Sequence, residues 1–385
     1  MTKEIIKNIS WIGVNNPESR DFHGINTPRG GSYNSYLIED ESPTIIDGVN
    51  KPFFKEYLKS LKETIKPDKI KFIVLNHIEP DHTGALVELL KECKNATILC
   101  SEKCKEFLKA MFDITHNIRV VNDNEEISLG KYTLRVLIQP MIHWPETMMT
   151  YLIDEKILFS GDLFGTEISH EKLFADEMKE FKELTRDYYA IVFRPQAYAV
   201  NKAIERIKDL KLNYIFSTHG PVYRKNLDKI INYYSELSNN AEEDKVLIIY
   251  FSVWHSTQKM ANQIAKGVIS EGKKVVMYDL ADCNFVRLQA EALTSKAIAL
   301  GSLTILGGYH PLFETLFSFL KLNRQKKKFA LFGSYGWVDS SIPQMENRLL
   351  KDGNEILFKA PFRFGKMNKK DLNLLTEIGR ELSRL

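Results

Sequence analysis

The stretch NHIEPDHTGA, residues 76–85, places two histidines and two carboxylates within six positions, directly after the apolar run KFIVL. It is either a metal site or a polar loop that follows a strand. Side chains alternate with period two in an extended segment, so we expect His77, Glu79 and Asp81 to point the same way. His82 must then turn toward a second position. A metal site needs ligands from several loops, so this cluster predicts partners elsewhere in the chain.

Three further residues are candidate partners: His143, Asp162 and His219 each lie at or just beyond the end of an apolar run. Loops at strand ends are held by a rigid scaffold and can position reactive side chains. Taken singly, these residues are more often core histidines or a turn aspartate. Together with the first cluster they give four imidazoles and three carboxylates. That set is sufficient for two metals if one carboxylate bridges them.

Length and composition indicate the class of protein. A chain of 385 residues suits two domains, and 44% hydrophobic with 27% charged residues is typical of a soluble globular protein. No segment is apolar enough to span a bilayer, and the N-terminus lacks a secretory signal, so we expect a cytoplasmic protein without membrane contact. The net charge of +3 comes from interspersed charges of both signs, which argues against a nucleic-acid surface.

Two minor features have ordinary interpretations. The basic run RQKKKF, 324–329, is predicted to be a solvated turn before a strand, with a docking patch for an acidic partner as the alternative. The four cysteines contain no C-x-x-C pair and no zinc or iron–sulfur spacing, so buried structural thiols are expected.

The chain divides into two predicted α/β domains. Residues 1–240 contain many short apolar strands with interspersed helices, which indicates a layered sandwich. A polar stretch at 235–245 separates them from residues 245–385. There, five strands alternate with five helices, the pattern of a doubly wound parallel sheet.

The second domain opens with a strand, a short polar loop and a helix, YFSVWHSTQKMANQIAKG. Backbone amides at a helix N-terminus, with the hydroxyls of Ser252, Ser256 and Thr257, form a phosphate site. A helix N-cap explains the same residues almost as well. No G-x-G-x-x-G motif is present, so a Rossmann dinucleotide site is not indicated.

The histidine and carboxylate pattern resembles the metallo-β-lactamase fold. Its hydrolases open with H-x-H-x-D-H, whereas here Glu79 replaces the second histidine, as in flavodiiron proteins, also called A-type flavoproteins. The added carboxylate makes the site more anionic and better suited to iron than to hydrolytic zinc. The resemblance implies an N-terminal αββα sandwich. It also implies that His77, Glu79 and His143 bind one iron, that Asp81, His82 and His219 bind the other, and that Asp162 bridges them.

The same resemblance implies a shell around the irons. The stretch RDFHGINTPRGGSYNSYLI, 20–38, matches the family's N-terminal pattern and places His23 near the iron pair as a donor, unless it caps a turn. Either Tyr188 or Tyr189 is expected near the irons.

The second domain resembles flavodoxins, which implies FMN rather than FAD. The loops 301–311 and 332–341 resemble those that enclose the flavin ring, with Tyr335 and Trp337 packing near it. Ordinary surface aromatics are the alternative. The predicted flavin-binding residues are Ser252, Val253, Trp254, His255, Ser256, Thr257, Ser302, Leu303, Thr304, Gly307, Ser334, Tyr335, Gly336 and Trp337.

The resemblance as a whole implies an oxidoreductase that passes electrons through FMN to a non-haem diiron site. That site reduces O2 to water, NO to N2O, or both. No rubredoxin module follows the second domain, so we expect an external donor: rubredoxin, reduced coenzyme F420 or a flavoprotein reductase. A head-to-tail homodimer or a dimer of dimers is implied. The competing hypotheses are a dinuclear zinc hydrolase with an accessory flavodoxin domain and a non-catalytic electron-transfer protein with a vestigial site.

Overall fold

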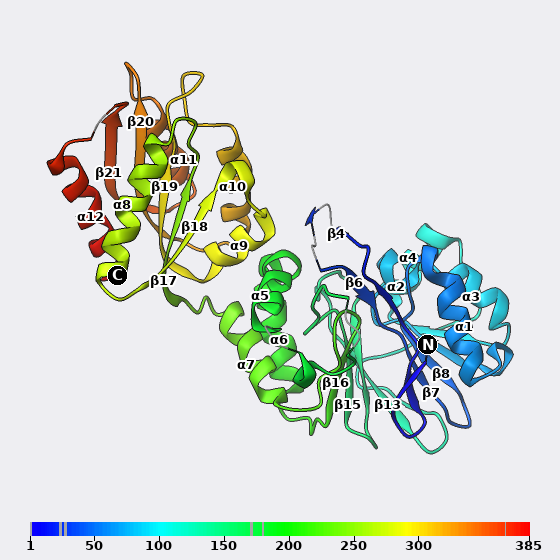
Figure 1. The fold of residues 1–385 in the computed structure, drawn as a ribbon. Helices are drawn as coiled ribbons and strands as arrows, with labels where there is room; N and C mark the ends of the chain where they lie inside the picture. The colour runs from blue at the N-terminus through cyan, green and yellow to red at the C-terminus, as the bar shows by residue number, and fades with distance from the viewer. Residues whose placement is uncertain (1, 23–24, 27–28, 170–171, 179–180, 366) are drawn as a thin grey trace. The chain divides into compact units, whose positions relative to one another are not determined.

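The structure is a computed structural model that describes residues 2–22, 25–26, 29–169, 172–178, 181–365 and 367–385. The chain forms two compact units, Met1–Ser238 and Asn239–Leu385 (Figure 1). The division lies within the polar stretch 235–245.

Two mixed sheets form the centre of the first unit (Figure 1). The first sheet has the order β1 (Lys3–Ile6), β2 (Ile9–Trp11), β7 (Tyr36–Ile38), β8 (Thr44–Ile46), β9 (Phe72–Val74), β10 (Thr97–Cys100), β11 (Ile118–Val120). The second has the order β12 (Glu126–Ser128), β13 (Thr133–Ile138), β14 (Met148–Leu152), β15 (Ile157–Gly161), β16 (Tyr214–Ser217). Two short pairs are β3 (Val14–Asn16) with β6 (Gly31–Tyr33) and β4 (Asp21–Phe22) with β5 (Ile25–Asn26).

Helices cover the outer faces of both sheets. One apolar core lies between the sheets, and a second lies between the first sheet and helices α1, α3 and α4. This is the predicted αββα sandwich. The helices of the unit are α1 (Phe54–Thr64), α2 (Pro80–Thr83), α3 (Leu86–Glu92), α4 (Glu102–Phe112), α5 (Phe181–Val192), α6 (Ala197–Ile207) and α7 (Leu227–Ser238). Short 3-10 turns are η1 (Lys51–Phe53), η2 (Pro67–Lys69), η3 (Ala175–Glu177) and η4 (Arg194–Gln196).

The sandwich brings the ends of several strands to one edge. Strands β15 and β16 are parallel neighbours, so their carboxyl ends lie side by side. The loop after β9 is joined to the start of β14 by a hydrogen bond from Met148 N to Asn76 O, 2.9 Å. Segments that are distant in sequence and belong to different sheets therefore meet at this edge.

The second unit has a single parallel sheet with the order β18 (Lys274–Asp279), β17 (Glu243–Tyr250), β19 (Ser295–Gly301), β20 (Lys328–Tyr335), β21 (Glu355–Arg363). One core lies under α8 and α12, and the other under α9, α10 and α11. The predicted doubly wound fold is therefore confirmed. The helices are α8 (Ser256–Ser270), η5 (Leu280–Asp282), α9 (Phe285–Thr294), α10 (Leu312–Leu322), α11 (Ser341–Lys351) and α12 (Lys369–Ser383).

Two lysines are buried near the amino ends of these strands. Lys245 is 1% exposed, and its Nζ lies 2.5 Å from Glu291 and 2.8 Å from Glu243. Lys327 is 5% exposed and donates to Glu242 and to the carbonyl of Ser295. The interpretation of 324–329 as a solvated turn is therefore wrong at Lys327, because its ammonium group is bound by Glu242 and by the backbone carbonyl at the start of β19. Among the described residues, no helix has the length and apolarity needed to cross a bilayer.

Candidate metal centre

The motif 76–82 leaves its strand and turns into a short helix. Asp47 fixes its start, accepting hydrogen bonds at 2.7 and 2.9 Å from the backbone and side-chain nitrogens of Asn76. Pro80 then begins helix α2, because its fixed φ suits the first helical position. Asp81 therefore lies in a helical turn and belongs to a different group of potential ligands from His77 and Glu79. The expectation that all three residues share one face of an extended segment was wrong at Asp81.

The first group of potential ligands lies around Glu79. Its Oε2 is 3.2 Å from His77 Nε2 and 3.1 Å from His143 Nε2. Oδ2 of Asp162 is 3.2 Å from His143 Nε2 and 3.8 Å from His77 Nε2. One nitrogen or oxygen atom from each of these four residues therefore faces a common point.

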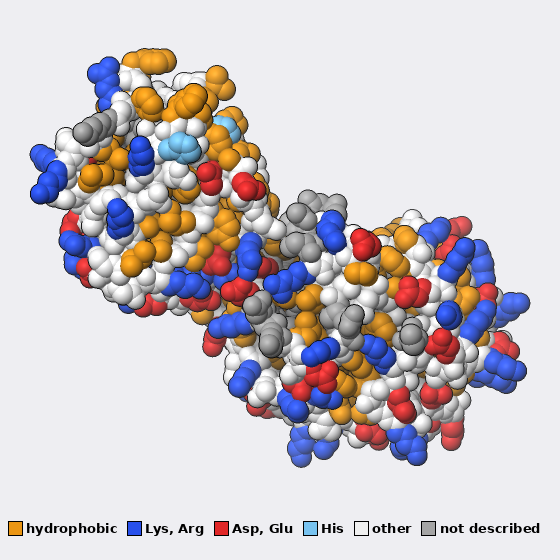
Figure 2. Space-filling view, viewed as in Figure 1, with side chains coloured by type: hydrophobic (Ala, Val, Ile, Leu, Met, Phe, Trp, Pro, Cys, Tyr) orange, Lys and Arg blue, Asp and Glu red, His pale blue; other side chains and the backbone are white. Residues whose placement is uncertain are grey.

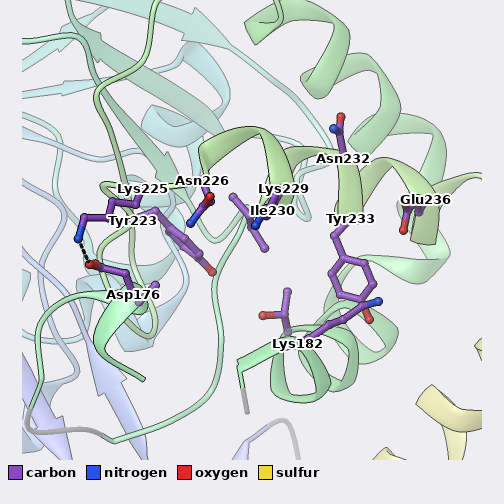
Figure 3. A pocket seen from close by; sticks show the side chains of 12 residues that line it. Asp176, Lys182, Tyr223, Lys225, Asn226, Lys229, Ile230, Asn232, Tyr233 and Glu236 are labelled. Atoms are coloured by element: carbon purple, nitrogen blue, oxygen red, sulfur yellow. Dashed lines mark ion pairs between the residues drawn. The ribbon is translucent and has the colours of Figure 1, made fainter. Parts of the chain in front are cut away.

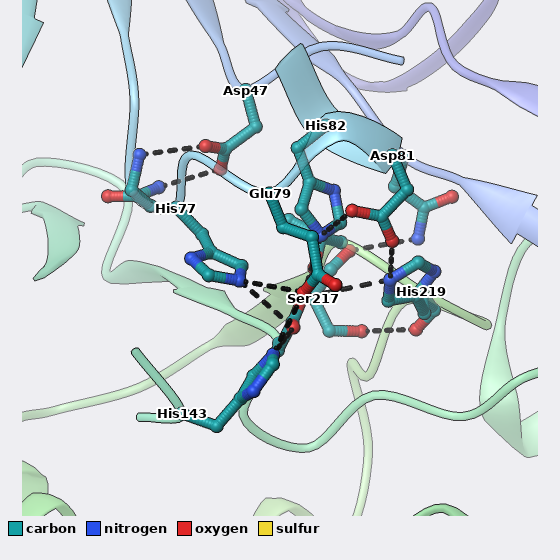
Figure 4. A network of polar contacts seen from close by, with 12 residues as sticks. Asp47, His77, Glu79, Asp81, His82, His143, Ser217 and His219 are labelled. Atoms are coloured by element: carbon teal, nitrogen blue, oxygen red, sulfur yellow. Dashed lines mark hydrogen bonds and ion pairs between the residues drawn. The ribbon is translucent and has the colours of Figure 1, made fainter. Parts of the chain in front are cut away.

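The second group is formed by Asp81, His82 and His219. Asp81 Oδ1 is 3.3 Å from His82 Nε2, and Asp81 Oδ2 is 3.1 Å from His219 Nε2. Oδ1 of Asp162 is 3.0 Å from His82 Nε2 and 3.7 Å from His219 Nε2. The two oxygens of Asp162 thus face different groups. Figure 4 shows the side chains of six of these residues pointing toward one another: His77, Glu79, Asp81, His82, His143 and His219.

These separations match the spacing of ligands around a metal ion. Ligand atoms about 2.1 Å from an ion, at octahedral or tetrahedral angles, are about 3.0–3.4 Å apart. Six of the eight contacts above lie between 3.0 and 3.3 Å, and the other two are 3.7 and 3.8 Å. His77, His82, Asp162 and His219 are at most 2% exposed.

The charges in the cluster favour a bound cation. Burial alone would lower the pKa of His219, but the hydrogen bond to Asp81 and the nearby carboxylates raise that pKa to about 10. Burial would raise the pKa of Asp162, yet the surrounding imidazoles hold it well below its usual value. The carboxylates therefore stay ionised and draw positive charge to the imidazoles. Metal ions that replace those protons satisfy the same carboxylates.

The buried polar atoms also fit a pair of ions. Nδ1 of His82 has no hydrogen-bond partner among the described residues, and Nε2 of the same ring faces the carboxylate oxygens of Asp81 and Asp162. Buried imidazole nitrogens without partners are costly unless another group binds them. The set of nitrogen and oxygen donors, without sulfur, suits iron and other borderline-hard metals.

Two buried glutamates near the cluster were missed by the sequence analysis. Glu146 Oε1 is 2.7 Å from His77 Nδ1, and Glu167 Oε2 is 3.4 Å from His219 Nδ1. Burial raises the pKa of Glu167 to about 8, against a lowering effect of His219. Glu146 follows His143 by three positions and Glu167 follows Asp162 by five. Only this nearness to predicted ligands could have indicated them.

The two tyrosines left open by the sequence have different surroundings. The ring of Tyr188 lies 5.9 Å from the ring of His219, between centroids. Tyr189 instead contacts Tyr234, and its hydroxyl lies 2.9 Å from the hydroxyl of Ser238. Tyr188 is therefore the tyrosine that approaches the cluster. His23 lies outside the described residues.

The three predicted flavin loops lie at the carboxyl ends of β17, β19 and β20. Thr257 is buried in the first turn of α8, and its hydroxyl lies 3.2 Å from that of Ser334. Thr304 N donates to Ser334 O at 2.8 Å, which joins the second and third loops. Ser252 Oγ accepts from Gln258 N at 3.3 Å and so faces the start of α8. The structure thus brings hydroxyls from separate loops to one edge of the sheet.

Large apolar side chains at the tips of these loops are exposed. Trp254 is 73% exposed, Leu306 is 91% exposed and Trp337 is 89% exposed. Figure 2 shows hydrophobic side chains gathered over this end of the second unit. The remaining predicted residues belong to the same loops: Val253, His255, Ser256, Ser302, Leu303, Gly307, Tyr335 and Gly336. A flat aromatic ligand would find apolar side chains on both the second and third loops.

A separate hollow of about 550 Å³ lies between α5, α7 and η3 in the first unit (Figure 3). Lys182, Lys229 and Tyr233 are among the residues that line it, and Lys225 Nζ is 2.9 Å from Asp176 across one side. It includes none of the seven cluster residues. This hollow is therefore not where the potential ligands converge.

Comparisons with known proteins match both units. The model of the ODP family beta lactamase matches residues 32–220, and the flavodoxin model matches residues 248–375. A nitric oxide reductase of Moorella thermoacetica is 31% identical over 98% of this chain and 97% of that protein. An anaerobic nitric oxide reductase flavorubredoxin of Pectobacterium atrosepticum is 31% identical over 100% of this chain and 77% of that protein.

Solved structures match the same full length. The rubredoxin oxygen:oxidoreductase of Desulfovibrio gigas has a TM-score of 0.94 and 30% identity, covering 100% of this chain and 98% of that one. This chain belongs to the flavodiiron protein family. The flavodiiron protein of Giardia intestinalis also has a TM-score of 0.94, with 29% identity, covering 100% of this chain and 96% of its own. The family resemblance predicted from Glu79 is confirmed.

Proposed function

We propose that this flavodiiron protein passes electrons through FMN in residues 245–385 to a pair of irons in residues 1–240, where O2 is reduced to water, NO to N2O, or both. The observation that carries the proposal is the position of Asp162. Its two oxygens face two groups of ligands, each with histidine nitrogens and a further carboxylate. One carboxylate shared between two groups is the arrangement that a dinuclear centre requires.

We assign the ligands by group. His77, Glu79 and His143 would hold one iron, and Asp81, His82 and His219 would hold the other. Asp162 would bridge them. Glu79 gives the first group a carboxylate where the related hydrolases have a histidine, which favours iron over zinc.

The residues around the cluster have defined tasks in this reaction. Bound by these residues, an iron pair would supply electrons to the substrate, and FMN would supply electrons to the iron pair. Glu79, Asp81 and His143 have 16, 15 and 9% of their side chains exposed, so the cluster opens on their side. Trp144 and Phe193 lie against His77 and His143, with ring centroids 5.3 and 6.2 Å apart. These aromatic side chains limit water while admitting a small, weakly polar substrate such as O2 or NO.

In the second unit we propose that the FMN phosphate binds at the first turn of α8. Backbone amides at that helix N-terminus, with the hydroxyls of Thr257 and Ser334, provide donors for an anion. The loops that carry Leu306 and Trp337 would enclose the flavin ring. Ser252 is 3.3 Å from the amide of Gln258 and would help to hold the loop.

The partners follow from the same proposal. We propose rubredoxin, reduced coenzyme F420 or a flavoprotein reductase as the electron donor. The relatives from Desulfovibrio gigas and Pectobacterium atrosepticum have names that refer to rubredoxin. We further propose a head-to-tail homodimer, or a dimer of dimers, in the cytoplasm.

Metal analysis and anaerobic kinetics test the function. The purified protein is expected to contain two irons and one FMN per chain. The reduced protein, mixed separately with O2 and with NO in a stopped-flow instrument, should reoxidise faster with its preferred substrate. Each candidate donor, supplied in turn, would then be ranked by the rate of flavin reduction. Two zinc ions with hydrolysis of a β-lactam or thioester would overturn the proposal.

A further inference from the structure

The carboxylate of Glu146 is buried directly behind one potential ligand. Its Oε1 is 2.7 Å from His77 Nδ1 and also accepts a hydrogen bond from Ile78 N at 3.1 Å. The residue is 2% exposed. On the other side of the ring, His77 Nε2 lies 3.2 Å from Oε2 of Glu79. Glu146 and the first metal position are therefore on opposite sides of the same imidazole.

The backbone around Glu146 is held independently of that contact. Its carbonyl oxygen accepts a hydrogen bond from Ser101 Oγ at 2.6 Å. The same Ser101 Oγ accepts from Cys104 N at 3.1 Å, which caps helix α4. The next residue, Thr147, donates from Oγ1 to Gln139 O at 2.6 Å. Glu146 is thus fixed to the scaffold before any contact with His77 is counted.

A carboxylate at Nδ1 determines how His77 can act. Because a carboxylate oxygen accepts a hydrogen bond, Glu146 keeps a proton on Nδ1, so Nε2 is the ring nitrogen left to bind a metal ion. An anionic acceptor also makes the imidazole a stronger electron donor to a metal. Oε2 of Glu146 has no hydrogen-bond partner among the described residues, so the charge of this carboxylate is satisfied mainly through Oε1.

The corresponding histidine of the second group has a different acceptor. His219 Nδ1 lies 2.7 Å from the carbonyl oxygen of Ser32, whereas the nearest carboxylate, Glu167, is 3.4 Å away. A neutral carbonyl polarises an imidazole less than a close carboxylate does. The two metal positions therefore differ in the basicity of one histidine ligand each.

We propose that Glu146 is a positioning residue that orients His77 and strengthens its donation, so that the iron held by His77 is bound more tightly and favours the ferric state more than its neighbour. The inference depends on the proposed diiron function. It adds an asymmetry between the two irons that the ligand set alone does not contain.

The substitution Glu146→Gln tests the charge with little change in shape, because the amide oxygen can still accept from Nδ1. Iron release is measured under anaerobic conditions with increasing concentrations of a chelator. The midpoint potential of the iron pair is measured by a redox titration that is monitored by electron paramagnetic resonance. We expect one of the two irons to be released at least tenfold more readily. A tenfold loss of preference for the ferric state corresponds to a rise of about 59 mV for one electron.

Two further variants separate the effect of the carboxylate from a general loss of structure. Glu102→Gln makes the same change in the exposed first turn of α4 and should leave both readouts at the wild-type values. Glu146→Asp keeps the charge but withdraws it from Nδ1, and should shift both readouts in the same direction by less. If Glu146→Gln does not fold, Glu146→Asp is measured in its place.

The outcomes distinguish this inference from the proposed function. If the wild-type protein binds two irons, but Glu146→Gln releases both at the wild-type chelator concentration with an unchanged potential, the role of Glu146 is refuted and the function stands. Equal weakening of both irons also refutes the asymmetry. If the wild-type protein binds no iron pair, the proposed function fails first.

Discussion

Replacing Asp162 with asparagine should remove both irons while the fold of the second unit is preserved. The carboxylate faces His143 through Oδ2 at 3.2 Å and His82 through Oδ1 at 3.0 Å. The amide of asparagine keeps the shape and one oxygen, but its nitrogen cannot bind a metal ion and its charge is zero. Each metal position therefore loses electrostatic attraction, and one position also loses a donor atom.

The size of the effect follows from Coulomb's law. One negative charge and a divalent ion about 4 Å apart attract by roughly 8 kcal/mol at an effective dielectric constant of about 20. Much of that is offset, because the variant no longer has to remove a buried carboxylate from water. We expect a net loss of at least about 3 kcal/mol per ion, which is about a hundredfold in affinity.

The assay is iron content after dialysis against a graded chelator, with flavin absorbance as the internal reference. Thr218→Val provides a graded comparison, because Thr218 Oγ1 donates to Asp162 Oδ1 at 2.5 Å without being a ligand. It should weaken binding by about 10- to 100-fold at most. Asp123→Asn, at an exposed residue that pairs with Arg206 and belongs to neither group of potential ligands, should leave iron retention unchanged. Wild-type iron retention in Asp162→Asn would refute the bridging role.

Three other outcomes are expected. Thr257→Ala should weaken FMN binding by about tenfold with unchanged iron content, because a hydroxyl that lies 3.2 Å from Ser334 is lost. Titration of the FMN-free protein with FMN, followed by flavin fluorescence, measures the dissociation constant. An unchanged dissociation constant contradicts the phosphate site. Lys245→Met should destabilise the second unit by about 3–5 kcal/mol in urea unfolding, since Glu291 is left charged and buried. The double variant with Glu291→Leu should recover most of this loss of stability. Equal stability of the single variant and the wild-type protein would count against the buried ion pair. Ferrous iron at about 100 times its dissociation constant should stabilise the first unit by about 2.7 kcal/mol per site, which raises its Tm. A thermal melt with an unchanged Tm would mean that the folded cluster does not bind iron.

Much of the site was predictable because its ligands are marked by strand ends. His77, His143, Asp162 and His219 each follow an apolar run, and the sandwich brings these runs to one edge. The parallel sheet of the second unit was also predictable, since regular alternation of strands and helices allows few other arrangements.

Other features depend on tertiary contacts that no local pattern determines. Asp81 was placed on the wrong face because Pro80 begins a helical turn within a run that alternation suggested was extended. Glu146 could not be separated from many surface glutamates, as its role depends on a contact with His77 across 69 positions of sequence. Lys327 belongs to a basic run, yet acceptors on neighbouring strands bind it in the interior.

The order in which the ligands occur along the chain bears on how the protein matures. His77 is synthesised early and His219 late, with 142 positions between them (219 minus 77). At roughly 5–20 residues per second, a ribosome needs about 7–30 s to cover that interval. Throughout it the second group of donors lacks His219, and an unfolded chain rarely presents a formed metal site. Under the proposed diiron function, we therefore expect the iron pair to be completed only after the last histidine has been synthesised and has joined the folded sandwich.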